Sequence, residues 1–238
     1  MMRHRTKNKK QGTIFARSEK GFTILELMFV IAIFGIMTSI TLFGFRDYGV
    51  QTSFDNLAQD VALHLVSAQK AAISGKLSLS TLSPFPPRVG VTFTSGTTPT
   101  PATQEFTYFN DIPTVTTYNG KYDTTPSCGA TGSECISKTR MTNGEYVALI
   151  SYAPFGSPYT SLPAGSTASV TFTRPFPDAM ITLCLSSGTC YPPVQNVYIE
   201  LGSTTRPTMK KTIVVTGLGE VRVYSGSTAC AYSGGGGC

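Results

Sequence analysis

The sequence predicts an α+β protein in which a long N-terminal helix packs on a domain of antiparallel β-sheets. Residues 22–45 are almost wholly apolar, and residues 46–75 carry apolar side chains at helical spacing. Residues 76–238 are instead rich in Thr, Ser, Gly and Pro, with short alternating segments that are typical of strands. With a basic leader over residues 1–21, these segments give the expected organisation of the chain.

The excess positive charge of the chain lies in this leader. The chain has 238 residues, a formal charge of +6 and only 13% charged residues. The leader holds seven of the 19 Lys and Arg residues and one of the 13 acids, which leaves twelve of each in the remainder. A formally neutral remainder argues against a broadly basic domain and against a nucleic-acid partner. A basic leader before an apolar segment indicates export.

The apolar segment is long enough to cross a membrane. Its 24 residues would span ~36 Å as a helix, which exceeds the hydrocarbon core of a bilayer. A secretory signal has a shorter core followed by a small-residue cleavage site, and this sequence has neither. Because the basic leader should stay in the cytoplasm, we expect a single-pass protein of the cytoplasmic (inner) membrane with its C-terminal domain outside.

Glu26 is the one ionisable residue of the apolar segment. A carboxylate at the centre of a membrane helix costs about 2.5–3.5 kcal/mol, and a plain anchor gains nothing from it. Cleavage after Gly21 would give Phe22 a free α-amino group, and this cation would offset the charge of Glu26 within the chain or from a neighbouring subunit. An uncleaved single-pass anchor is the alternative.

Residues 20–27, KGFTILEL, resemble the class III leader of type IV pilins and type II secretion pseudopilins. The resemblance implies cleavage between Gly21 and Phe22 by a prepilin peptidase, N-methylation of Phe22, and pairing of Glu26 with the amine of an adjacent subunit. It also implies the pilin fold and assembly with other pilin or pseudopilin subunits on an inner-membrane platform, as a filament at the cell surface or in the periplasm. Residues 57–75 resemble the corresponding helix of GspH/FimT-type minor pilins and pseudopilins.

The N-terminal helix is expected to run from Phe22 to Ser74 and to end at Gly75, a natural C-cap. Steps of three and four residues define one apolar face of its second half. This face comprises Val50, Phe54, Leu57, Val61, Leu65, Ala68 and Ala72. His64 lies near the face and is interpreted as a packed helix residue, because no cysteines or carboxylates cluster with it at metal-ligand spacing.

Candidate strands occupy much of the second part of the chain, where β-branched and aromatic residues alternate with polar ones. They cover residues 77–82, 88–94, 104–109, 145–153, 168–174, 179–186, 195–202, 211–216 and 220–224. Gly217, Leu218 and Gly219 are expected to form a tight turn between the last two. No long helix is indicated in this part, which predicts antiparallel sheets against which the N-terminal helix packs.

The cysteines fall into three close pairs along the chain. These pairs are Cys128/Cys135, Cys184/Cys190 and Cys230/Cys238. None of the spacings is C-x-x-C, so zinc binding and thioredoxin-like chemistry are disfavoured. Disulfides between neighbouring cysteines are the simpler interpretation in an oxidising compartment, although other connectivities stay open. Each would stabilise the fold by roughly 2–3 kcal/mol on the chain-entropy model.

The sequence gives little support to catalysis. It contains no nucleophile elbow, zinc-protease motif or P-loop, so we expect no enzyme activity, no cofactor and no metal site. The acids Glu105, Asp111, Asp123, Glu134, Glu145 and Asp178 are scattered along the chain and are interpreted as solvated surface carboxylates. Asp111 and Asp123 could meet after folding, but their spacing does not argue for a metal site. The expected function is that of a structural subunit, by resemblance a minor pilin or pseudopilin.

Two binding functions on the same scaffold are alternatives. Some FimT-type minor pilins bind DNA for uptake through a basic C-terminal strand region. The corresponding candidates here are Arg206, Lys210, Lys211 and Arg222. The G-R-x-R pattern of that region reads Gly-Glu-Val-Arg at residues 219–222, and the missing arginine weakens this alternative. The other alternative is an adhesive tip that contacts its target through Tyr108, Phe109 and Tyr159.

Overall fold

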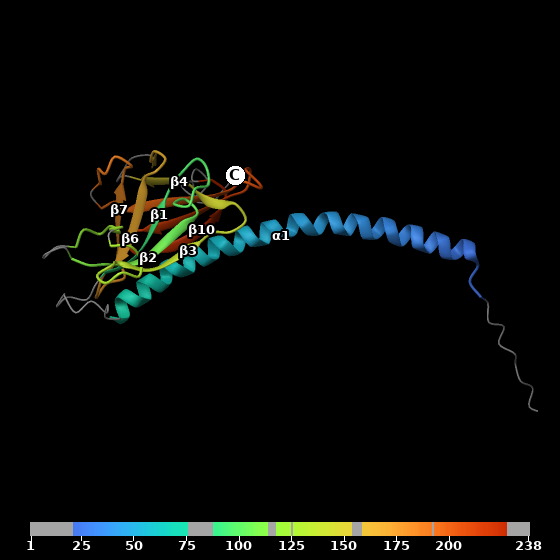
Figure 1. The fold of residues 1–238 in the computed structure, drawn as a ribbon, viewed down its shortest axis with the longest axis horizontal. Coiled ribbons are helices and arrows are strands. Elements are labelled where there is room, and N and C mark those ends of the chain that lie inside the picture. Colours follow the sequence, from blue (N-terminus) through green and yellow to red (C-terminus); the bar gives the residue numbers. More distant parts are fainter. Residues whose placement is uncertain are drawn as a thin grey trace, which may run out of the picture. The chain divides into compact units, whose positions relative to one another are not determined.

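The computed structural model describes residues 21–75, 88–113, 118–124, 126–153, 159–191 and 193–227. Within these ranges one long helix, α1, is followed by the strands β1 to β10 (Figure 1). The predicted α+β class is therefore confirmed. The chain divides into two compact units, Met1–Gly49 and Val50–Cys238, and each is described by itself.

Helix α1 (Ile24–Ser74) begins two residues later than expected, because Thr23 caps it. The backbone N–H of Glu26 donates to Thr23 Oγ1 at 3.2 Å, and the N–H of Leu27 donates to the Thr23 carbonyl at 3.1 Å. Such a cap satisfies backbone donors that have no partner within the helix. The C-terminal end falls at Gly75, whose φ of 64° lies in the left-handed region that glycine adopts most readily, as expected for a C-cap.

The second half of α1 forms part of the core of the second unit. Its buried side chains are Phe54, Ala58, Val61, Leu65, Ala68 and Ala72. This confirms most of the predicted apolar face, although Val50 and Leu57 are only partly buried. His64 packs edge-on against Phe106 with 5.0 Å between the ring centroids, which agrees with its interpretation as a packed helix residue.

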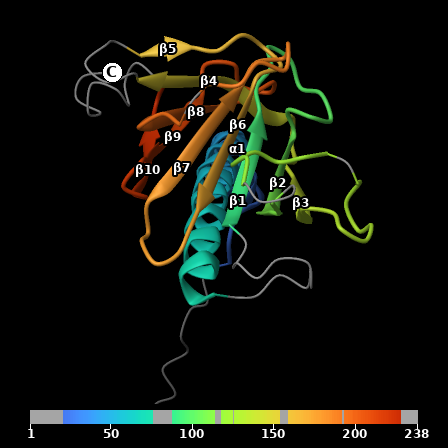
Figure 2. The same ribbon diagram turned by 90° about the vertical axis from the view of Figure 1, so that its left-hand side faces the viewer.

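The strands form two five-stranded sheets in which all neighbours pair antiparallel. The first sheet has the order β3 (Cys135–Arg140), β2 (Glu105–Asp111), β1 (Arg88–Thr94), β6 (Thr167–Phe172) and β7 (Ala179–Cys184). The second has the order β10 (Val221–Ser225), β9 (Lys210–Thr216), β8 (Asn196–Ser203), β4 (Glu145–Ala153) and β5 (Thr160–Ser161). Figure 2 shows these strands from a second direction. Buried side chains of both sheets and of α1 share one core.

Two strands are absent from the sequence-based expectation. β3 lies at the edge of the first sheet and, apart from Cys135, its side chains are wholly or partly exposed, so it shows no apolar alternation. β5 has only two residues, both exposed. β6 and β7 each end two residues earlier than expected, ahead of Pro175 and of the turn at residues 186–188. The candidate strand at 77–82 lies outside the described residues.

Candidate processing and assembly site

Glu26 lies in the first turn of α1, three residues after the capping Thr23. Thr-x-x-Glu is the sequence pattern of a capping box. The sequence therefore contains the signal for Thr23 as the N-cap, although Thr23 is not among the predicted site residues. An acidic group near a helix N-terminus is also favoured by the helix dipole. Within the described residues, the Glu26 carboxylate is exposed and takes part in no hydrogen bond or ion pair.

The helix after Glu26 presents a continuous apolar surface. Over Ile24–Leu42 the mean hydropathy is 2.2 and none of the segment is buried inside the structure. Nineteen residues rise ~28 Å as a helix, which approaches the thickness of a bilayer's hydrocarbon core. The hydroxyls of Thr38 and Thr41 donate to carbonyls one turn earlier, at 2.6 and 2.7 Å, so neither requires water. This segment is suited to a membrane or to a packed bundle of helices.

The predicted cleavage site directly precedes this helix. Gly21 and Phe22 lie before the first residue of α1, and the side chain of Phe22 is 82% exposed. The bond between them therefore lies in extended or irregular backbone, which a peptidase can reach more readily than a bond inside a helix. The structure places Gly21, Phe22 and Glu26 within one short segment, as the resemblance implies, and their roles stay predictions.

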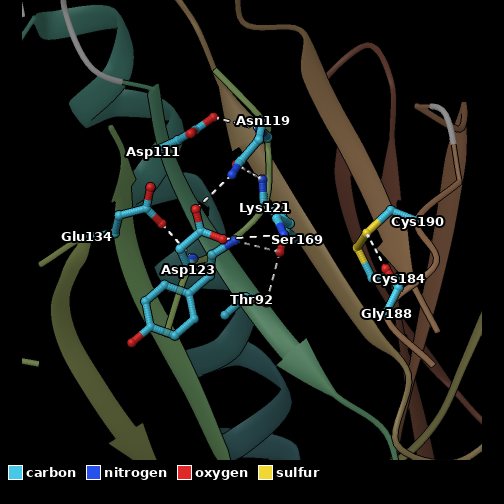
Figure 3. Close-up of polar contacts among 12 residues, drawn as sticks. Thr92, Asp111, Asn119, Lys121, Asp123, Glu134, Ser169, Cys184, Gly188 and Cys190 are labelled. Atoms are coloured by element: carbon cyan, nitrogen blue, oxygen red, sulfur yellow. Dashed lines mark hydrogen bonds and ion pairs between the residues drawn. A yellow bond between two sulfur atoms is a disulfide. The ribbon is translucent and has the colours of Figure 1, made fainter. Parts of the chain in front are cut away.

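Two disulfides lie in the second unit. Cys128 is joined to Cys135, and Cys184 is joined to Cys190. The second bridge closes the turn after β7 (Figure 3). In this turn the N–H of Gly188 donates to the Leu185 carbonyl at 2.9 Å. Cys230 and Cys238 lie outside the described residues.

The basic candidates for nucleic-acid binding lie beside acids. Lys210 Nζ is 2.7 Å from Glu200 Oε1, and Lys211 Nζ is 2.5 Å from Asp55 Oδ1 on α1. Arg222 Nε is 2.6 Å from Glu220 Oε1, and hydrogen bonds to Tyr224 and to Glu220 raise the pKa of Arg222 above its ordinary value. Arg206 lies in the turn after β8. These three ion pairs balance positive charge that would otherwise attract phosphate.

The structure brings three of the scattered acids together around the segment that carries Asn119 and Gly120 (Figure 3). Asp111 accepts a hydrogen bond from the Gly120 N–H at 2.8 Å. Glu134 accepts hydrogen bonds from the N–H groups of Ile112, at 3.1 Å, and of Asp123, at 2.6 Å. Asp123 in turn accepts one from the Asn119 side chain at 2.8 Å. These carboxylates therefore fasten the connection between β2 and β3 to the first sheet.

The interpretation of these acids as solvated is wrong for Asp111, Glu134 and Glu145, which are at most 5% exposed. Burial raises the pKa of Glu134 to about 7, against the lowering effect of its two backbone donors. Burial also raises the pKa values of Asp111 and Glu145. Sequence reasoning missed these positions because burial of a lone acid depends on long-range packing. Among the described residues, no three His, Cys, Asp or Glu side chains form a group suited to a metal ion.

Of the aromatic residues proposed for an adhesive tip, Phe109 is buried, and Tyr108 and Tyr159 are only partly exposed. Phe109 is fully buried, and its ring lies 5.5 Å from that of Tyr122. Tyr108 is only partly exposed and packs against the core. The proposed role of Phe109 as a surface contact is therefore wrong: Phe109 lies on the face of β2 opposite to Tyr108, where Tyr122 from the β2–β3 connection packs against it.

Comparison with known proteins identifies the class. Residues 16–42 match the prokaryotic N-terminal methylation motif. The chain is also similar to fimbrial proteins and type IV pilins over part of its length. It is therefore a type IV pilin-like protein. The finer assignment to GspH/FimT-type subunits stays a prediction.

The individual relatives differ in how much of the chain they match. A fimbrial protein of Pseudomonas aeruginosa is 32% identical over 81 residues, or 34% of this chain and 53% of that protein. Fimbrial protein EcpC of Eikenella corrodens is 41% identical over 56 residues, which are 24% of this chain and 33% of that protein. The type IV major alpha-pilin of Moraxella bovis is 28% identical over 131 residues, which are 52% of this chain and 78% of that protein. The chain thus spans about half the length of the Pseudomonas relative. No solved structure matches this chain.

Proposed function

We propose that this chain is a structural, non-catalytic subunit of a filament, namely a minor pilin or pseudopilin of a type IV pilus-like or type II secretion assembly. One observation carries the proposal: the methylation motif coincides with the start of an exposed apolar helix whose first turn holds Glu26. A plain anchor does not need that combination, because the gain from the helix dipole is smaller than the cost of an unpaired carboxylate in the membrane.

The first step is processing at the membrane. A prepilin peptidase cleaves between Gly21 and Phe22, and Phe22 is then N-methylated. Cleavage removes the basic leader, so the mature chain is formally neutral. It also creates a cationic amine four residues before Glu26, while the second unit lies outside the cytoplasmic membrane.

The second step is assembly on an inner-membrane platform. In a setting of low dielectric constant, the unpaired carboxylate of Glu26 is unfavourable, and the amine of Phe22 on an adjacent subunit offsets it. The ion pair thus fixes how far the next subunit slides along its neighbours. The apolar side chains of Ile24–Leu42 exchange lipid for other helices, which retains their burial in an apolar surrounding.

The proposal is tested with Glu26→Gln in the native assembly system. Glutamine retains a side chain suited to the capping box while it removes the charge. Processing is expected to continue, whereas the amount of subunit in sheared or purified filaments falls at least about tenfold, as for loss of a charged partner. Asp178→Asn, which removes an exposed carboxylate between β6 and β7, is the control and should assemble normally. Normal incorporation of Glu26→Gln would contradict the pairing role.

A further inference from the structure

A polar cavity of about 320 Å³ lies in the second unit, where the second half of α1 meets the β3–β4 connection. Its lining residues are Ser53, Asn56, Leu57 and Asp60 on α1, and Thr139, Arg140, Thr142 and Glu145 on and after β3. The four α1 residues recur at steps of three and four, so they share one face of the helix. The volume is at the lower end of the range of small-molecule sites.

Glu145 is the unusual member of this lining. As the first residue of β4 it shares a face with Val147, which is fully buried in the core, so its side chain points inward at the end of the sheet. It is 3% exposed. Among the described residues its carboxylate has no hydrogen bond or ion pair, and burial raises its pKa. Neither of its oxygens is sealed off as a buried, unpartnered atom, so the carboxylate opens onto the cavity, where a bound cation can supply the partner that the protein does not.

The wall that carries Glu145 is fixed before any ligand binds. Asn143 adopts a left-handed conformation with φ of 59°, and its side-chain amide donates to Ser53 Oγ on α1 at 3.1 Å. The N–H of Glu145 donates to the Thr142 carbonyl at 3.2 Å, which closes the turn. The turn is thus held against the helix, and the cavity between them is pre-organised.

The charges of the lining indicate what the missing partner is. Glu145 and Asp60 supply two carboxylates against one guanidinium, that of Arg140, which is exposed. Hydroxyls and an amide supply further hydrogen-bond acceptors, and Leu57 supplies an apolar contact. We propose that this cavity binds a cationic nitrogen group, an alkylammonium or a guanidinium, whose charge is balanced by Glu145 and whose aliphatic stem lies along Leu57. The source of that group is either a small free amine or a basic side chain of another chain.

The test is calorimetric titration of the full chain in detergent with n-butylammonium chloride. We expect saturable binding of one equivalent, weakened at least about tenfold in Glu145→Gln, which removes a charged hydrogen-bond partner but keeps the shape. Asp60→Asn, at an exposed position, gives a second and smaller loss, and it serves should Glu145→Gln fail to fold. Asp178→Asn should bind like the unchanged chain. The proposal would be overturned if the unchanged chain shows no saturable binding, or if Glu145→Gln and Asp60→Asn both bind butylammonium as tightly as the unchanged chain.

A second arm separates the two sources. Assembled filaments are treated with a zero-length carbodiimide cross-linker and mapped by mass spectrometry. A bond between Glu145 and a lysine of another chain that excess butylammonium suppresses assigns the site to a neighbouring side chain. Butylammonium binding to filaments without such a bond, and with the affinity of the isolated chain, assigns it to a free amine, because an arginine of another chain, which carbodiimide does not couple, would weaken that binding.

Discussion

Replacement of Glu134 by glutamine is expected to reduce the pH dependence of the stability of the second unit. Glu134 is 5% exposed and accepts hydrogen bonds from two backbone N–H groups. Burial raises its pKa from 4.5 to about 7, and the nearby carboxylates of Asp123 and Asp111 contribute in the same direction. The folded protein therefore holds this proton more tightly than the unfolded chain does.

The sign and size of this pH dependence follow from the difference between the pKa of Glu134 in the folded protein and in the unfolded chain. Because the pKa is higher in the folded state, the contribution of Glu134 is fully present below pH 4.5 and is lost as the pH rises through about 7. At ~1.4 kcal/mol for each pH unit between the two values, the loss is at most about 3 kcal/mol. Asp111 and Glu145, whose pKa values burial also raises, add to the same trend in the unchanged chain.

The contribution of Glu134 is measured by urea unfolding of the full, disulfide-bonded chain in detergent. Unfolding is followed by circular dichroism at pH 4.5 and pH 8. The unchanged chain should lose more stability between these pH values than Glu134→Gln does, by up to about 3 kcal/mol. Asp178→Asn should behave like the unchanged chain, since its side chain is exposed. An equal loss in the unchanged chain and in Glu134→Gln would refute the assignment of this proton to Glu134.

Three further predictions concern the core, a disulfide and nucleic acid. Phe54→Ala, at a side chain 1% exposed, should lower the free energy of unfolding by roughly 3–5 kcal/mol. The control Phe176→Ala, at a side chain 66% exposed, should change it by less than about 1 kcal/mol. Similar urea midpoints for these two variants would contradict the packing described. Joint replacement of Cys184 and Cys190 by serine should cost roughly 2–3 kcal/mol, and no loss would show that the bridge is dispensable. The processed chain, which begins at Phe22 and so lacks the basic leader, should give no gel shift with DNA even at low salt, because three of the candidate cations lie beside carboxylates; a salt-sensitive shift would contradict this.

Local patterns were sufficient to predict the helix and most strands. The helical repeat that includes Phe54 and Leu65 correctly marked the face of α1 that enters the core, and β1 and β4 have the predicted bounds. These elements alternate or repeat because one of their faces is buried, and that periodicity is visible in the sequence. β3 escaped prediction because an exposed edge strand has no such periodicity.

The buried acids were not predictable in the same way. Asp111 and Glu134 lie 23 positions apart in the chain and converge only because β3 pairs with β2. Nothing in the residues around Glu145 separates a solvated glutamate from one that lines a cavity against α1. By contrast, Gly21, Phe22 and Glu26 form a contiguous motif, so sequence alone identifies them without any long-range contact.

The central claim is most directly tested by intact-mass and N-terminal analysis of the protein isolated from membranes. The account predicts a mature chain that begins at Phe22 and carries one methyl group on its α-amino nitrogen. A chain that retains residues 1–21, or one that is cleaved elsewhere than after Gly21, would contradict it.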